Sequence, residues 1–140
     1  MAVALKQNAD ASMGLQGTNG DDGQFVAITF QYTTASPLTQ YLGSFSRRMI
    51  VKNIYCKPQT ASSNAVTATL YNVPDATAIG SGTALHTGTF SLQATANTNV
   101  KLSLTSAACD IAQDSSIGVV ISGALGAAGN GTITVWLAPA

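Results

Sequence analysis

The chain has 140 residues, a length that fits one domain built around one hydrophobic core. Hydrophobic residues make up 46% of it, which supports a globular fold, whereas only 9% are charged, far below the usual quarter or so. Six Lys and Arg balance six Asp, and the only adjacent basic pair is Arg47 and Arg48, so the composition argues against nucleic-acid binding.

Residues 1–23 predict an N-terminal arm, and residues 24–140 a single folded domain. The arm is rich in Gly, Asn and Asp, and its large apolar residues Leu5, Met13 and Leu15 are scattered. Such a segment buries too little apolar surface to offset its ordering entropy. Two interpretations stay open. The arm is either a frayed terminus, or it is anchored by its three apolar side chains on a neighbouring subunit.

The folded domain begins with a period-two alternation of apolar residues over 25–32, which predicts a strand. The next predicted strands cover 40–45, 49–57 and 66–71. Turn residues between the second and third of these strands indicate that the two form a hairpin. The second half of the chain predicts further strands over 86–92, 99–104, 117–121 and 132–137, and Asn130-Gly131 predicts a tight turn before the last of them.

About eight strands at regular spacing, without helical periodicity, predict an all-β fold. We expect a two-sheet antiparallel sandwich of jelly-roll type with an extended N-terminal arm. In the last strand Ile133, Val135 and Leu137 face opposite to Trp136. If the aliphatic set is inside, two positions are open to Trp136. It either faces solvent, a ligand or a partner, or it lies under a loop, and we favour the position under a loop.

Residues able to carry chemistry are few. His86 is the single histidine, so it would be the base of any Ser-His-Asp or Cys-His site, yet no nucleophile elbow surrounds it and a surface or strand-end histidine is favoured. One His with the separated Cys56 and Cys109 fits no zinc spacing, and both thiols are expected to be reduced. Asp110 and Asp114 could pair as acid and base or as a Ca²⁺ site, but turn capping is favoured. We therefore predict no catalytic, cofactor or metal site.

Function is then expected to lie on surfaces. Tyr41 and Tyr55 flank Arg47 and Arg48 and form a candidate contact patch, against the alternative of ordinary solvated residues. A surface with so few charges suits a protein that packs against neighbours. The sequence starts without a secretory signal and has no run of about 18 apolar residues, so we expect a soluble product, made in a cytoplasm, without a membrane partner.

Three stretches carry a family resemblance. The opening Met-Ala-Val-Ala-Leu-Lys-Gln-Asn-Ala-Asp, the central Thr-Ala-Leu-His-Thr-Gly-Thr-Phe-Ser-Leu and the ending Thr-Ile-Thr-Val-Trp-Leu-Ala-Pro-Ala resemble small virion proteins of tailed bacteriophages. More narrowly, the chain resembles a jelly-roll capsid cement, or decoration, protein of a short-tailed phage. That resemblance implies a structural protein on the outer capsid surface, made in the host cytoplasm, that clamps adjacent major capsid protein subunits. It defines no motif that assigns residue roles.

Two binding functions and one enzymatic function follow as hypotheses. The first is the capsid cement protein, a homodimer in preference to a homotrimer, whose contacts are made by Leu5, Met13, Leu15, Tyr41, Arg47, Arg48 and Trp136. The second is a jelly-roll glycan-binding module of a phage fibre or secreted enzyme, with Trp136 or a tyrosine as stacking platform. An enzyme ranks last, because it would depend on His86 or an Asp pair.

Overall fold

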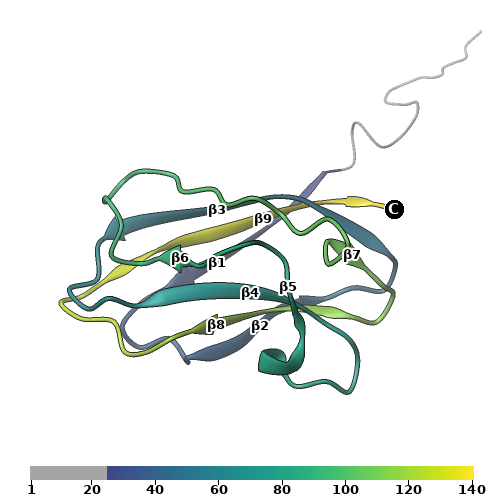
Figure 1. Ribbon diagram of the computed structural model, residues 1–140, viewed down its shortest axis with the longest axis horizontal. Helices are drawn as coiled ribbons and strands as arrows, with labels where there is room; N and C mark the ends of the chain where they lie inside the picture. The colour runs from purple at the N-terminus through teal and green to yellow at the C-terminus, as the bar shows by residue number, and fades with distance from the viewer. Residues whose placement is uncertain (1–24) are drawn as a thin grey trace, which may run out of the picture.

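The computed structural model describes residues 25–140, which form two antiparallel β-sheets packed face to face (Figure 1). This arrangement confirms the predicted all-β sandwich of jelly-roll type. The predicted arm, with Leu5, Met13 and Leu15, lies outside the described residues.

The first sheet, sheet A, contains both the first and the last strand of the described chain. Its order is β1 (Val26–Tyr32), β9 (Asn130–Pro139), β3 (Met49–Thr60) and β7 (Asp110–Ile111). Leu137 on β9 is opposite Val26 on β1 and opposite Val51 on β3. The last strand therefore lies between the first and the third, and it completes this sheet.

The second sheet, sheet B, has the order β2 (Thr39–Ser44), β8 (Ser116–Ile121), β4 (Thr67–Val73) and β5 (Thr83–Ala84), with β6 (Phe90–Ser91) also paired to β4. Successive strands alternate between the two sheets from β1 to β4, as they do in a jelly roll. A short 3-10 helix, Ile79–Ser81, lies against β8, where a Cβ on Gly118 would come 2.7 Å from Ile79.

The hydrophobic core fills the space between the two sheets. Ile133, Val135 and Leu137 are fully buried, so of the two faces that the alternation in the last strand separates, the aliphatic one is inside. Ile117 and Val119 of β8 are equally buried and belong to the same core cluster. Full burial of each such side chain is worth about 1.5–3 kcal/mol, so the facing β8 and β9 contribute much of the stability.

The hairpin predicted between residues 49–57 and 66–71 is wrong. The first segment is β3 in sheet A and the second is β4 in sheet B, so the connection crosses the sandwich. Buried Ser62 fixes this crossing, because its hydroxyl accepts hydrogen bonds from the backbone N–H groups of Asn64 and Gly126 and its own N–H donates to the Leu92 carbonyl. Turn residues mark the bend but do not reveal which sheet the next strand joins.

The two strands predicted over 86–92 and 99–104 are mostly loop. Only β6 and isolated bridges form there, between His86 and Leu104 and between Val100 and Cys56. Val100, Leu102 and Leu104 still pack against the core, so the alternation correctly indicated the buried side chains. Burial of alternate residues in an extended loop gives the same sequence pattern as a strand.

The tight turn predicted at Asn130-Gly131 is also misplaced. The chain turns at Ala127 and Ala128, whose φ angles are 48° and 57°, and Asn130 already begins β9. Glycine is needed at 131 for space, because a Cβ there would lie 2.5 Å from both the Lys57 carbonyl oxygen and the Tyr32 hydroxyl.

Tyr32 is fully buried at this point, and its hydroxyl has no hydrogen-bond partner among the described residues. Burial, together with the neighbouring Cys56 thiol, raises the pKa of Tyr32 well above its ordinary value, so the hydroxyl stays protonated. A buried donor without a partner is a cost to the folded state.

We expect Tyr32→Phe to leave the free energy of unfolding unchanged or to increase it by up to about 2 kcal/mol, because the substitution removes an unsatisfied hydroxyl. Urea titration followed by tryptophan fluorescence measures the change. Tyr55→Phe, in a partly exposed ring, is the matched control with no expected effect. A loss above about 1 kcal/mol for Tyr32→Phe would instead show that the hydroxyl has a partner in the folded protein, either the Cys56 thiol or a bound water.

Candidate functional site

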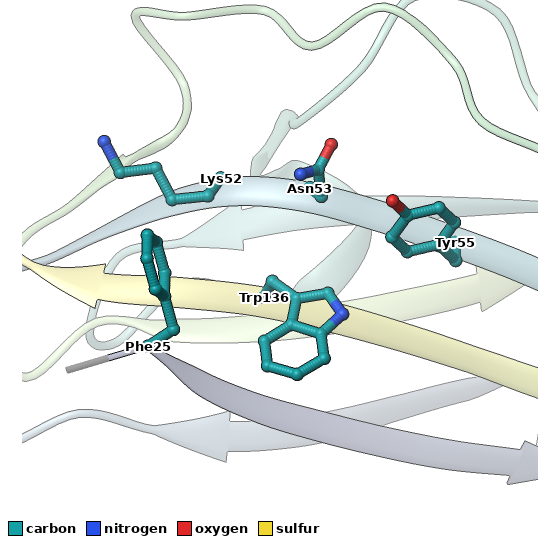
Figure 2. Close-up of a pocket in the computed structure, with 5 residues that line it drawn as sticks. All are labelled: Phe25, Lys52, Asn53, Tyr55 and Trp136. Atoms are coloured by element: carbon teal, nitrogen blue, oxygen red, sulfur yellow. The ribbon is translucent and has the colours of Figure 1, made fainter. Parts of the chain in front are cut away.

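A hollow of about 370 Å³ on the outer face of sheet A is the candidate functional site. It is lined by Phe25, Lys52, Asn53, Tyr55 and Trp136. Figure 2 shows that these side chains come from three neighbouring strands: Phe25 just before β1, Trp136 on the central β9, and the other three on β3. We call this surface the Trp136 hollow.

An irregularity in β3 places two polar side chains beside Trp136. Val51 pairs with Leu137 and Asn53 with Trp136, so Lys52 is an extra residue, a β-bulge. Val51 and Ile54 are both buried, while Lys52 between them is exposed and Asn53 is half-buried. The bulge thus presents two consecutive residues to the outer face and keeps the core side of the strand apolar.

Positive charge gathers on this face. Lys52, Lys57 and Lys101 are exposed, and the Lys101 ammonium lies 5.4 Å from the centre of the Tyr55 ring, within range of a cation–π interaction. No carboxylate lines the Trp136 hollow among residues 25–140. Asp75 lines a different hollow on sheet B, and Asp110 pairs with Arg48. An apolar floor with ammonium groups around it suits a partner that offers apolar and anionic groups together.

Trp136 is 38% exposed. The sequence left two positions for this side chain, and the favoured one, under a loop, is wrong, because Trp136 lies on the open outer face and lines the hollow. The loop that follows β6 brings Lys101 over Tyr55 instead. An exposed indole ring beside Asn53 and Lys52 can stack on a flat apolar group while the amide and the amine bind polar atoms.

The patch predicted from Tyr41, Tyr55, Arg47 and Arg48 is not assembled as one surface. Tyr41 belongs to sheet B and Tyr55 to sheet A, each on the outer side, so the two rings lie on opposite faces of the sandwich. Tyr41 is 52% exposed, and its hydroxyl donates to the Thr77 carbonyl. Arg47 is exposed in the connection between β2 and β3.

Arg48 is held by an ion pair rather than left free for a partner. Its Nε and Nη2 donate to the two carboxylate oxygens of Asp110, both at 2.7 Å. The Arg48 guanidinium lowers the pKa of Asp110, which keeps that carboxylate ionised. Both side chains are largely exposed, so the pair contributes little stability, although it orients β7 against the start of β3.

Sites for metal chemistry are not assembled in the described part of the chain. Residues 25–140 bring together no group of three or more His, Cys, Asp or Glu side chains. Asp110 is held by Arg48, while Asp114 has a φ of 69° and donates its backbone N–H to the Phe45 carbonyl. The described residues also contain no helix with the length and apolar character needed to cross a bilayer.

Both cysteines are free and buried. Burial raises the pKa of the Cys56 thiol to about 12, and it also raises the pKa of Cys109. The Cys109 thiol donates to the Leu85 carbonyl at 3.5 Å. Protonated, buried thiols are weak nucleophiles, so both cysteines act here as apolar core residues.

Comparisons with known proteins give distant similarities only. No protein-family model matches the chain, and no curated protein matches it in sequence. Among solved structures, the cyanophage Pam1 capsid asymmetric unit aligns over 94% of this chain and 96% of the matched chain, with a TM-score of 0.47 and 16% identity. The infectious bursal disease virus Gx strain aligns over 83% of this chain, which spans 32% of the matched chain, with a TM-score of 0.46 and 16% identity. Neither similarity assigns a function or a residue role to this chain.

His86 is a structural residue that forms an isolated bridge two residues after β5, and because it is buried the expected surface position is wrong. The ring is 3% exposed, lies edge-on to Phe90 at 4.7 Å between ring centres, and accepts a hydrogen bond at Nε2 from the Leu70 backbone N–H. That bond requires a neutral ring. Accordingly, burial lowers the pKa of His86 below its ordinary value of 6.5.

We expect the protein to lose stability as the pH falls below about 6.5, because the unfolded chain then binds a proton at His86 that the folded chain resists. The contribution is fully present above pH 6.5 and disappears toward the folded-state pKa. Denaturant titrations at a series of pH values measure it. His86→Gln, which retains an acceptor for the Leu70 N–H but cannot titrate, should flatten the slope. Equal slopes in the two proteins would contradict this assignment.

Proposed function

We propose that this protein is a structural virion protein that binds the outer surface of a phage capsid and cements adjacent major capsid protein subunits. The sequence resemblance to capsid cement proteins motivates the proposal. The structural observation that carries it is an exposed aromatic and basic surface, the Trp136 hollow, on a rigid sandwich whose remaining surface carries few charges. Exposed apolar surfaces of this kind mark protein–protein contacts, and Trp is enriched among the residues that dominate them.

The hollow would act as the anchor of each copy. An apolar side chain protruding from the capsid would enter the hollow against Trp136 and Phe25, while Lys52 and Lys101 would face carboxylates beside it. Many weak contacts repeated over a capsid lattice add up, because each bound copy raises the effective concentration for the next contact. The predicted arm would add a second contact on a neighbouring subunit.

We expect Trp136→Ala to weaken capsid binding by about 2 kcal/mol, roughly thirtyfold in affinity, because truncation removes a central aromatic anchor. Occupancy on particles stripped of this protein, titrated with the variant, measures the effect. Tyr41→Ala is the matched control, since Tyr41 is an exposed ring on the opposite face of the sandwich.

In the same assay, deletion of residues 1–20 tests the arm through occupancy and heat-induced DNA release. Unchanged occupancy and release would remove the arm from the proposal. Loss of binding in Tyr41→Ala, with Trp136→Ala unaffected, would move the capsid contact to sheet B. If the intact protein fails to bind particles at all, the cement function itself is wrong.

The composition of the hollow also favours a second candidate, a glycan-binding module. Trp136 offers a stacking surface for a sugar ring, and Asn53 and Lys52 offer an amide and an ammonium group beside it. The ammonium groups on this face favour acidic sugars over neutral ones. The alternative of a Ca²⁺ site at Asp110 and Asp114 gives this candidate no support, because the Asp110 carboxylate is held by Arg48.

Because Trp136 is the single tryptophan of the sequence, its fluorescence reports directly on the hollow. If the glycan candidate holds, uronic-acid oligosaccharides should shift or quench the emission, and Lys52→Gln should weaken the effect more for acidic than for neutral sugars. A glycan array provides the independent measurement. No signal on the array and no change in emission would rule this candidate out.

A further inference from the structure

The strand β1 leaves a free edge on sheet A. It pairs with β9 on one side, and within residues 25–140 no strand pairs with its other side. Its pairing with β9 runs without a register shift from Val26 to Tyr32. An edge of this kind offers a row of unpaired backbone N–H and C=O groups to a further strand.

Proteins usually protect such edges with charges, prolines, bulges or very short strands. The seven residues of β1 contain no charge and no proline, and the strand has no bulge. The three other edges differ. In sheet B, β2 has a register shift between Tyr41 and Gly43, and on the far side of that sheet β5 and β6 have two residues each. At the far end of sheet A, β7 also has two residues. The β1 edge is therefore the unprotected one of the four.

Exposed apolar side chains lie at the starts of the two edge strands β1 and β2. Phe25 and Val26 at the start of β1 are 49% and 48% exposed. The free edge of β2 lies below β1, since a Cβ on Gly43 would be 3.6 Å from Cδ1 of Ile28, and Leu38 at its start is 48% exposed. One side of the sandwich thus combines unpaired backbone with apolar surface.

We propose that a second copy of this chain occupies this edge, with the two β1 strands antiparallel about a twofold axis at Thr29. Full overlap of the seven residues of β1 defines that register. Thr29 is opposite the partner's Thr29, Ala27 is opposite the partner's Gln31, and Ile28 is opposite the partner's Phe30.

The strand is self-complementary in this register. Apolar residues oppose apolar residues on the core side, while Thr opposes Thr and Ala opposes Gln on the outer side, and these pairs suit an antiparallel sheet. Because β1 carries no charge, the pairing brings no like charges together.

Such a dimer joins two copies of sheet A into one continuous sheet with the Trp136 hollows on the same face. It concerns the protein in solution, so it holds or fails independently of capsid binding. For the proposed function, the dimer would carry two Trp136 hollows in one rigid body. Binding of one hollow to the capsid would then raise the effective concentration of the other and strengthen attachment.

A charge-pattern experiment on the full chain tests both the edge and the register. In the proposed dimer residue 27 faces residue 31 of the other copy, so A27K/Q31K opposes two pairs of like charges, whereas A27K/Q31E opposes two pairs of opposite charges. Both positions are exposed on the outer face. Sedimentation over a range of concentrations should give a dimer for the wild type and for A27K/Q31E, and a dissociation constant at least about tenfold higher for A27K/Q31K.

Equal melting behaviour of the two variants at concentrations where both are monomeric verifies that each one folds. Hydrogen exchange in the β1 amides should slow as the wild type dimerises. A wild-type monomer at all concentrations overturns the proposal, and so does a dimer that A27K/Q31K leaves intact. Protection of the β1 amides that is independent of concentration also overturns it, since the edge would then be covered within one chain.

Discussion

The structure depends on the position of β9 between β1 and β3. This strand supplies Ile133, Val135 and Leu137 to the core and accepts backbone pairing on both sides. Because both edges of β9 are used, β1 becomes one of the two outer strands of sheet A. The space available at Gly131, where β9 passes Tyr32 and Pro58, is so small that a side chain cannot be accommodated. Close packing around Gly131 therefore fixes the register of β1, β9 and β3.

The same strand decides where the candidate site lies. With its aliphatic residues inside, period-two alternation sends Trp136 to the outer face, at the centre of sheet A rather than at its rim. The bulge at Lys52 then brings polar side chains to the hollow from β3, and Phe25 reaches it from the start of β1. A surface built on three paired strands is rigid, so binding there would cost little ordering of the backbone.

Period-two patterns in the sequence predicted the fold class, the division of β9 into an aliphatic face and a Trp136 face, and most of the long strands, because alternation follows directly from strand geometry. Pairing was not predictable in this way: the connection after β3 contains ordinary turn residues, and only the packing around Ser62 sends it to the other sheet. The bulge had left a signal, since Val51 and Ile54 are three residues apart and cannot share a face of a regular strand. The burial of His86 had none, because its partners, Phe90 and the Leu70 N–H, come together only in the folded chain.

The central place of β9 also bears on the order of events during synthesis. Val26 pairs with Leu137, so sheet A cannot close before the residues of β9 have left the ribosome. Until then β1 and β3 have no common neighbour, and their apolar faces remain open to other chains, which makes incomplete molecules prone to association. Sheet B has the same dependence, because β2 and β4 both pair with β8, and only the two-residue β5 and β6 are available to β4 earlier. Both sheets therefore close only after the residues of β8 and β9 have been made.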